Sequence, residues 1–410
     1  MGRAIRYPSG PGVGLNDGHP PVSRPPKDAT RLIRAGQAPG KLAHTVGPPI
    51  QKGSTVLLAD AASLYDTAQP TYGRGGLATQ ETLMSALAEL EGAAEVRLFP
   101  SGLAAMTGAM LAVLKTGDEI LVTEAVYKPT RRFCDHVLRR FGVGVRYYRP
   151  RTAPETLIAM ASAATRLLVL ESPGSLTMEL QDAPAIARLA KVRGIITLMD
   201  NTWAASLYFK PLAHGVDISV QALTKYVGGH ADVFMGCAAA VDPAICTALD
   251  QAIWDFGWAV APEDAYQMLR GLRTLATRMA RHQESGLAVA AWLEGQPAVA
   301  QVLHPALPAS PDHAIWRRDY TGAAGLFSVV LKPCPTRAVH AFLDALKLFG
   351  LGFSWGGFES LALDADPQFD LREGGSPFAG PVVRLNIGLE DPDDLIDDLR
   401  CGFEALAAAS

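Results

Sequence analysis

The sequence has few cysteines and no long apolar segment. Its 410 residues contain five cysteines, an odd number, and no two of them are spaced as Cys-x-x-Cys. This pattern argues against a disulfide framework and against a structural zinc site, and it indicates a reducing compartment. The most apolar run, residues 103–114, is shorter than the roughly 20 residues needed to cross a bilayer. We therefore expect a cytoplasmic protein with no bound metal and no membrane partner.

An excess of charge of either sign is also missing. Lysine and arginine total 37 and aspartate and glutamate total 41, which gives a net charge of −4. Such a balance gives no reason to expect nucleic acid or an anionic membrane as a partner. The length instead predicts a globular chain of two or three domains.

Four segments differ in their pattern of apolar residues. Residues 1–27 are rich in proline and glycine, which predicts a flexible tail. Residues 28–76 show few regular apolar periods and predict an extended arm or loop region. Residues 77–271 alternate helical spacing with short apolar runs and predict a large domain. Residues 272–410 predict a smaller α+β domain, with longer helices and fewer strands.

Short apolar runs in the large domain predict strands of a parallel sheet. Helical stretches separate them, and the pattern is that of βα units on a mostly parallel sheet with helices on both faces. The expected strands are at 119–122, 167–170, 195–199 and 217–220, with a buried helix at 103–114. In the smaller domain we expect strands at 326–331 and 382–387 and helices at 337–348 and 391–408.

Polar residues follow three of the expected strands. Asp200 comes directly after one strand, Lys225 lies just beyond another, and Glu171 closes a third. In open parallel sheets, ligands bind beyond the carboxyl ends of the strands. These three positions therefore indicate an active site at that edge of the sheet.

Lys225 and Asp200 are residue types that pyridoxal 5′-phosphate (PLP) chemistry requires. Burial of Lys225 between an apolar strand and a Gly-Gly turn would lower its pKa and free its amine as nucleophile and base. On local composition alone, a surface lysine is the more frequent alternative. Asp200 could keep a pyridine nitrogen protonated, although an Asp that caps a turn is at least as frequent.

Candidate phosphate-binding groups lie in two further segments. The Ser101-Gly102 step opens the apolar helix and offers backbone N–H groups at its positive end, unless Ser101 is only an ordinary cap. The hydroxyl of Thr224 could bind the same phosphate. Arg74, in the arm, could bind phosphate oxygens through two of its guanidinium N–H groups at once, or it could lie in a solvated turn.

Two more residues could contact a cofactor ring or a substrate. Tyr127 follows the strand at 119–122 and could stack on a ring, although a half-buried tyrosine is the more frequent outcome. Arg384 lies within a strand-like apolar run and needs an anionic partner. A substrate carboxylate would provide one, and an internal salt bridge is the alternative.

Taken together, these segments resemble the Cys/Met-metabolism family of PLP-dependent enzymes over roughly residues 28–408. The resemblance is strongest at residues 72–76, 170–179, 199–205, 224–232 and 354–360. It implies a fold type I enzyme with a seven-stranded, mostly parallel sheet. It further implies that PLP forms a Schiff base with Lys225 and that Asp200 faces the ring nitrogen.

The resemblance also assigns roles to the other candidates. It implies that Gly102, Leu103 and Thr224 hold the phosphate and that Tyr127 stacks on the ring and assists Lys225 in catalysis. The neighbouring subunit would add Tyr72 and Arg74, so the site would belong to a dimer, and the family typically forms a dimer of dimers. The implied substrate-binding residues are Ser354, Trp355, Arg384 and Tyr72.

Departures from the broader family favour its β-lyase branch. Leu77-Ala78-Thr79 stands where the broader family often has Asn-Pro-Thr, and Ser175 stands where γ-acting members usually carry Asn. Ala222 replaces a common phosphate-binding serine, which puts that contact in doubt. The branch implies cleavage of L-cystathionine to L-homocysteine, pyruvate and ammonia in methionine biosynthesis. A γ-lyase, a γ-synthase and a PLP-binding regulator with weak activity stay open as alternatives.

Overall fold

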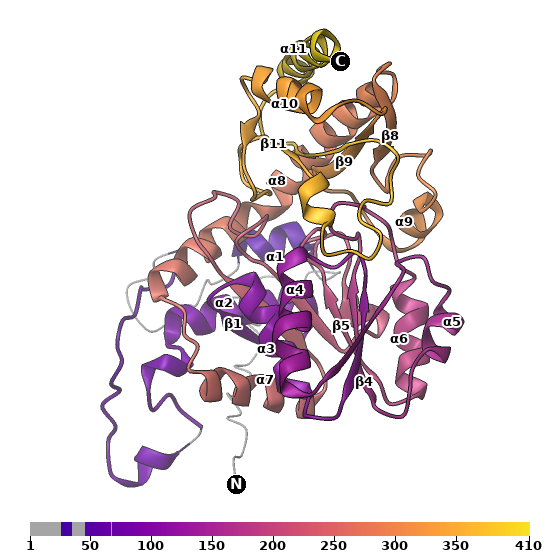
Figure 1. Ribbon diagram of the computed structural model, residues 1–410. Coiled ribbons are helices and arrows are strands. Elements are labelled where there is room, and N and C mark those ends of the chain that lie inside the picture. Colours follow the sequence, from indigo (N-terminus) through magenta and orange to yellow (C-terminus); the bar gives the residue numbers. More distant parts are fainter. Residues whose placement is uncertain (1–25, 35–45, 67) are drawn as a thin grey trace.

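The computed structural model describes residues 26–34, 46–66 and 68–410. Their elements gather around two β-sheets, one of seven strands and one of five. In Figure 1 the seven-stranded sheet occupies the lower half, and the five-stranded sheet, coloured orange to yellow, lies above it. Most of the tail expected at 1–27, up to residue 25, lies outside the described residues.

The larger sheet is mostly parallel, as the sequence predicted. Its strand order is β1-β7-β6-β5-β4-β2-β3, and only β7 runs antiparallel to its neighbours. All four expected strands are present, each within two residues of its expected ends. The strands are β1 (Glu95–Phe99), β2 (Glu119–Thr123), β3 (Gly144–Tyr148), β4 (Thr165–Glu171), β5 (Ile196–Asp200), β6 (Ile218–Gln221) and β7 (Gly236–Ala240).

Strand β4 shows why these segments form a buried parallel sheet. Residues 167–170 read Leu-Leu-Val-Leu and are fully buried. Because successive side chains point to opposite faces, Leu168 and Leu170 enter one apolar core while Leu167 and Val169 enter the other. A strand that is apolar at every position requires cover on both faces of its sheet.

Helices provide that cover. In Figure 1, α5 and α6 lie on one side of the large sheet, and α3, α4 and α7 lie on the other. Buried residues of α2, α6 and α8 join the first core, and those of α3 and α7 join the second. The helices are α2 (Ala78–Glu91), α3 (Gly102–Val113), α4 (Lys128–Phe133), α5 (Pro154–Ala159), α6 (Ala183–Val192), α7 (Pro243–Phe256) and α8 (Pro262–Glu294).

The smaller sheet is mixed and has a third apolar core beneath α10 and α11. Its order is β10-β11-β12-β9-β8, with only the β10–β11 pair parallel. The 33-residue helix α8 contributes to both the first and third cores, and the boundary expected between residues 271 and 272 lies within it. The elements are β8 (Val299–Leu303), α9 (His313–Asp319), β9 (Leu326–Leu331), α10 (Thr336–Ala345), β10 (Gly350–Leu351), β11 (Leu361–Asp364), β12 (Val382–Asn386) and α11 (Pro392–Ala409).

The beginning of the arm differs from the sequence prediction. Residues 28–34 were expected to be extended or loop-like but form helix α1 (Asp28–Arg34). Leu32 is its one buried residue and joins the first core, and Arg31 lies within 4 Å of Asp28 and of Glu89 on α2. A single apolar anchor gives no periodic signal, so this helix depends on tertiary contacts.

Three features of the described residues bear on what the sequence led us to expect of membrane segments, disulfides and metal sites. No helix among them is long and apolar enough to span a membrane. All five cysteines lie in described segments, and each of them is free. Within the same part of the chain, no group of three or more His, Cys, Asp and Glu side chains is arranged to hold a metal ion.

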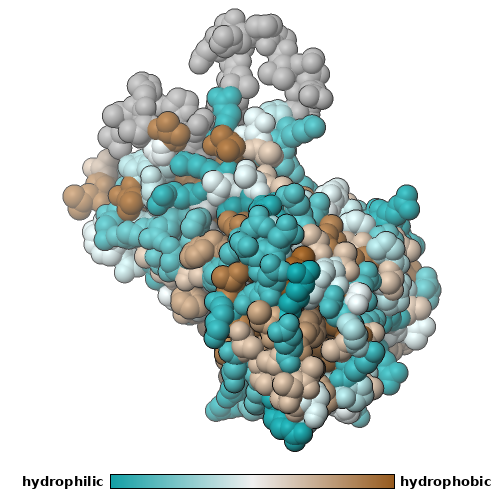
Figure 2. All heavy atoms as spheres, turned by 90° about the horizontal axis from the view of Figure 1, so that it is seen from above, coloured by the Kyte–Doolittle hydropathy of each residue, from teal (hydrophilic) through white to brown (hydrophobic). Residues whose placement is uncertain are grey.

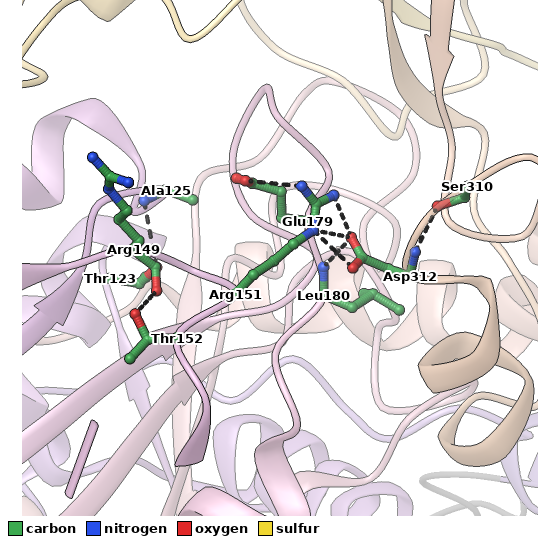
Figure 3. A network of polar contacts seen from close by, with 9 residues as sticks. All are labelled: Thr123, Ala125, Arg149, Arg151, Thr152, Glu179, Leu180, Ser310 and Asp312. Atoms are coloured by element: carbon green, nitrogen blue, oxygen red, sulfur yellow. Dashed lines mark hydrogen bonds and ion pairs between the residues drawn. The ribbon is translucent and has the colours of Figure 1, made fainter. Parts of the chain in front are cut away.

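A polar network joins the loops of the large sheet to the start of α9 (Figure 3). The buried carboxylate of Asp312 accepts hydrogen bonds from Arg151 Nε at 2.9 Å and from Arg151 Nη2 at 2.7 Å. The same carboxylate accepts the backbone N–H of Leu180 at 3.1 Å. Arg151 also lies 3.5 Å from Glu179. Asp312 therefore connects two loops of the large sheet to the C-terminal part of the chain.

We expect Asp312→Ala to lower the free energy of unfolding by about 1–3 kcal/mol, because it leaves the buried Leu180 N–H without an acceptor. The ion pair with the half-exposed Arg151 should add little to that loss. Urea denaturation followed by circular dichroism measures the change. Asp397→Ala, at an exposed ion pair with Arg400, is the control and should leave stability nearly unchanged. Equal effects of the two substitutions would contradict the assignment.

Candidate active site

The carboxyl ends of β4 and β5 and the segment after β6 bring the candidate residues to one edge of the large sheet. Glu171 and Asp200 end their strands and lie opposite each other in the parallel register. Lys225 follows the end of β6 by four residues. The edge is the one at which ligands bind in open parallel sheets.

Lys225 is largely buried, and its amine contacts the smaller domain. Its Nζ donates a hydrogen bond to Ser354 Oγ at 2.8 Å and lies 5.3 Å from the centroid of the Trp355 ring. Burial lowers the pKa of Lys225 to about 8, and the positive charge of Arg384 adds to this effect while Asp200 opposes it. About a tenth of the amine is thus unprotonated at pH 7, and this is the form that a nucleophile or a base requires.

Arg384 supplies a buried positive charge with no anionic partner among the described residues. It lies in β12 and is 6% exposed. Its Nη2 donates to the carbonyl oxygens of Gly352, Phe353 and Ser354 at 3.3, 2.9 and 3.0 Å. Burial lowers its pKa to about 10. The internal salt bridge considered from the sequence is not found, and a carboxylate ligand would neutralise this charge.

Asp200 is held by its own turn. Its Oδ1 accepts the backbone N–H of Thr202 at 2.9 Å and the hydroxyl of the same residue at 2.5 Å. The Thr202 hydroxyl in turn accepts the N–H of Ala222 at 2.9 Å. Burial raises the pKa of Asp200, while the hydrogen bonds from Thr202 and the charge of Lys225 oppose the rise. A protonated ring nitrogen would provide the opposite charge that such a carboxylate lacks.

The N-terminus of α3 meets the segment that precedes Lys225. Ser101 caps the helix and accepts the N–H of Ala104 at 3.1 Å. Among the described residues, no acceptor is found for the N–H groups of Gly102 and Leu103. A Cβ on Gly102 would lie 2.3 Å from the Cβ of Ala222, so this close approach requires glycine. Free N–H groups at a helix N-terminus bind phosphate well.

Thr224 and Tyr127 border the same edge. The hydroxyl of Thr224 accepts the N–H of Met235 at 2.9 Å and donates to its carbonyl at 3.2 Å. Tyr127 is the N-cap residue that immediately precedes α4, and its N–H donates to Glu171 Oε2 at 2.7 Å. Its side chain is 43% exposed. Partial burial is the largest cause of a raised pKa of Tyr127, so its hydroxyl keeps its proton.

Tyr72 and Arg74 are not brought to Lys225 within one chain. Both lie in the arm, where Arg74 Nη1 donates to the carbonyl of Trp254 on α7 at 3.1 Å. The guanidinium carbon of Arg74 lies 4.6 Å from the centroid of the Trp254 ring. Tyr72 is 46% exposed. In the described residues of a single chain, neither side chain contacts the group around Lys225.

Two residues at the site, Thr202 and Arg278, were not identified from the sequence, and Glu171 was identified there only as the end of a strand. Thr202 connects Asp200 to Ala222, and Glu171 lies beside Asp200 and holds the backbone of Tyr127. Arg278, on α8, donates to the carbonyl oxygens of Tyr226 at 2.6 Å and Val227 at 3.1 Å. It therefore fixes the turn after Lys225. The only signal for Arg278 in the sequence is an arginine at a position that helical spacing places on an apolar face.

The chemistry of these groups fits PLP. An amine of lowered pKa, a buried carboxylate without a cationic hydrogen-bond partner, and a helix N-terminus with free N–H groups match its aldehyde, ring nitrogen and phosphate. The buried Arg384 guanidinium matches the carboxylate of an amino-acid substrate. Lys225, Asp200, Gly102 and Leu103 could therefore hold the cofactor, with Arg384 left for the substrate.

Known proteins resemble the chain over nearly its whole length. The sequence profile described as "Cys/Met metabolism PLP-dependent enzyme" matches residues 29–404. A Rhizobium johnstonii protein, provisionally described as a cystathionine beta-lyase, is 48% identical over 92% of this chain and 96% of its own. Cystathionine beta-lyase of Escherichia coli is 40% identical over 91% of this chain and 97% of its own.

A solved structure has the same fold. Cystathionine gamma synthase from Xanthomonas oryzae pv. oryzae, crystallised with cystathionine, superposes with a TM-score of 0.89 at 31% identity. The alignment covers 94% of this chain and 100% of the other. The match extends over both sheets, so the fold type I architecture expected from the sequence is confirmed.

The charges around Lys225 lead to a test of its pKa. In the cofactor-free protein, we expect the amine to react with pyridoxal with a midpoint at about pH 8, because only the unprotonated form attacks an aldehyde. Arg384→Met removes a like charge and should move the midpoint to higher pH. Asp200→Asn removes an opposite charge and should move it to lower pH. Borohydride trapping and peptide mass spectrometry at Lys225 give the profile.

Arg318→Met serves as the control for that profile. Arg318 is half exposed and pairs with Asp182 and Asp319, so its loss should leave the midpoint in place. A midpoint that is unmoved in both site variants, or that moves in the same direction in both, would refute the electrostatic assignment.

Proposed function

Because the chain belongs to the Cys/Met metabolism family of PLP-dependent enzymes, we propose that it is a carbon–sulfur β-lyase. Its substrate would be L-cystathionine, and its products L-homocysteine, pyruvate and ammonia, as a step of methionine biosynthesis. The observation that carries the proposal is that Ser354 is contacted by both charged groups. The Lys225 amine donates to its hydroxyl, and the Arg384 guanidinium, which has no anionic partner among the described residues, donates to its carbonyl. Identities of 48% and 40% to relatives described as cystathionine beta-lyases support the choice of substrate.

The cofactor would be held from several sides. Lys225 would bind its aldehyde carbon, Asp200 its ring nitrogen, and the N–H groups of Gly102 and Leu103 its phosphate, with help from Thr224. Tyr127 would cover the ring. When bound, PLP supplies an electron sink that stabilises negative charge at the substrate Cα.

Residues of the chain would bind the substrate and transfer the protons. Arg384 and Ser354 bind the substrate carboxylate, Trp355 adds an apolar wall, and together they orient the Cα–H bond towards Lys225. The amine of Lys225, with its lowered pKa, takes that proton. The Lys225 ammonium or the Tyr127 hydroxyl, which keeps its proton, then protonates the leaving sulfur. Asp200 keeps its negative charge throughout and balances a protonated ring nitrogen.

The principal alternative is a γ-lyase or γ-synthase reaction. The fold alone does not decide between them, because a cystathionine gamma synthase superposes on 94% of this chain. The same residues would serve either reaction up to removal of the Cα proton. Ser175, where γ-acting members usually carry Asn, favours the β-lyase. A PLP-binding regulator with weak activity would bind the cofactor without turnover.

A second copy of the chain would complete the site. The arm exposes Leu57, Tyr65 and Tyr72, the first two by 90% or more, and apolar side chains protrude from that part of the molecule at the left of Figure 2. Burial of this arm against a partner would bring Tyr72 and Arg74 to the partner's phosphate and substrate. We propose a dimer of dimers in the cytoplasm, with residues 77–271 as the cofactor-binding domain and 272–410 as the smaller domain.

The reaction is tested by incubating the holoenzyme with L-cystathionine and identifying the keto acid. β-Elimination yields pyruvate and γ-elimination yields 2-oxobutyrate. We expect pyruvate, with homocysteine in equal amount. Formation of 2-oxobutyrate would replace the proposal by the γ-lyase alternative, and absence of either product would favour the regulator.

Lys225→Ala should lose the visible absorbance of lysine-bound PLP and reduce kcat on the order of a thousandfold or more, because it removes both the anchor and the base. Lys332→Ala, at an exposed lysine of the smaller domain, is the control and should retain both. Substantial turnover by Lys225→Ala would overturn the assignment of the base.

A further inference from the structure

Glu171 is a buried carboxyl group at the active-site edge that the reaction outlined above does not use. It ends β4, directly opposite Asp200 at the end of β5. Residues that face each other across parallel strands point to the same side of the sheet. Consistent with this, Val169 and Leu198, which lie two residues earlier on each strand, belong to the same apolar core. The two carboxyl groups therefore share one face of the sheet.

The contacts of Glu171 connect it to Tyr127 rather than to a cation. Its Oε2 accepts the backbone N–H of Tyr127, at the start of α4, at 2.7 Å. That N–H would otherwise lack an acceptor at a helix N-terminus. Its own N–H donates to the side chain of Gln181 at 3.2 Å. Among the described residues, no lysine, arginine or histidine lies within ion-pair distance of Glu171.

The charged groups around the pair decide which carboxyl keeps a proton. Burial and the charge of Asp200 raise the pKa of Glu171 well above its usual range, against hydrogen bonds from the backbone of Tyr127 and Ser175. Asp200 is favoured as the anion by the hydrogen bonds of Thr202 and the charge of Lys225. Two adjacent buried carboxyl groups do not both ionise readily. The charge thus stays on Asp200.

We propose that Glu171 is a positioning residue, which as a neutral carboxylic acid fixes the start of α4 at Tyr127 and leaves Asp200 as the charged member of the pair. The role rests on the proposed function, in which Tyr127 covers the cofactor ring. A carboxylate at position 171 would compete with Asp200 for the ring proton. An apolar residue there would release the backbone of Tyr127. A neutral hydrogen-bond acceptor meets both requirements.

Glu171→Gln imitates the neutral acid, since its amide oxygen can accept the Tyr127 N–H. We expect kcat, KM and the dissociation constant of PLP to stay within about threefold of wild type, because an uncharged acceptor remains in place. Glu171→Ala removes the acceptor and should reduce kcat/KM about tenfold or more while retaining the fold. Glu124→Gln, at a carboxyl group just beyond the end of neighbouring β2, is the matched control and should behave as wild type.

The protonation state is tested by holoenzyme unfolding in denaturant at several pH values and saturating PLP. A carboxyl group that is neutral when folded and ionised when unfolded releases a proton on unfolding. The unfolding equilibrium constant of wild type, relative to Glu171→Gln, should therefore rise about tenfold per pH unit above the pKa of an unfolded Glu, and level off above the folded pKa. Glu124→Gln, measured in the same way, is the control for replacing a carboxyl group by an amide at this edge of the sheet.

A ratio that stays constant from pH 5.5 to 7.5 would overturn the proposal, as would a Gln variant as impaired as the Ala variant. If unfolding is irreversible, the infrared band of a protonated carboxyl at neutral pH, present in wild type and lost in Glu171→Gln, decides the same question. Neither readout depends on the substrate. Failure to form pyruvate would therefore contradict the proposed function without affecting the test of the protonation state of Glu171.

Discussion

The site depends on keeping a few charges buried at the seam between the two sheets. Lys225 and Asp200 come from the large sheet, and Arg384 comes from the centre of the smaller one. Burial is costly for each charge, and it also makes each group sensitive to the others. The lowered pKa of Lys225 and the raised pKa of Asp200 both have burial as their largest cause. Any loosening of the seam would admit water and remove these shifts.

The backbone around Lys225 is fixed from both sides of that seam. Arg278, from α8, holds the carbonyl groups of Tyr226 and Val227. Gly356, from the smaller domain, approaches so closely that a Cβ there would lie 3.0 Å from the Tyr226 nitrogen, and its φ of +79° also favours glycine. Ser354, two residues before Gly356, accepts a hydrogen bond from the Lys225 amine through its hydroxyl. Packed backbone on both sides therefore fixes the segment that carries Lys225, and the Ser354 hydroxyl fixes its amine.

The sequence predicted the strands that consist mostly of large apolar residues. The strand at 326–331 has the expected bounds, and the helix at 103–114 is shifted by one residue. The strands β1 and β7 were missed, since Arg97 interrupts the first and the second reads Gly-Cys-Ala-Ala-Ala, without β-branched residues. These strands form because they pair with each other and, in β7, with β6. Pairing between segments about 140 residues apart leaves no local pattern.

The site shows the same division between local and distant signals. Lys225 and Asp200 follow strands and could be proposed from their local sequence, although only their combination with other segments made the proposal strong. The partners that set their properties lie far along the chain, since 129 residues separate Lys225 from Ser354. Glu171 is instructive because its strand end was noticed, yet its role follows only from register. Opposite Asp200 it has to be neutral, whereas next to a lysine the same residue would carry a charge.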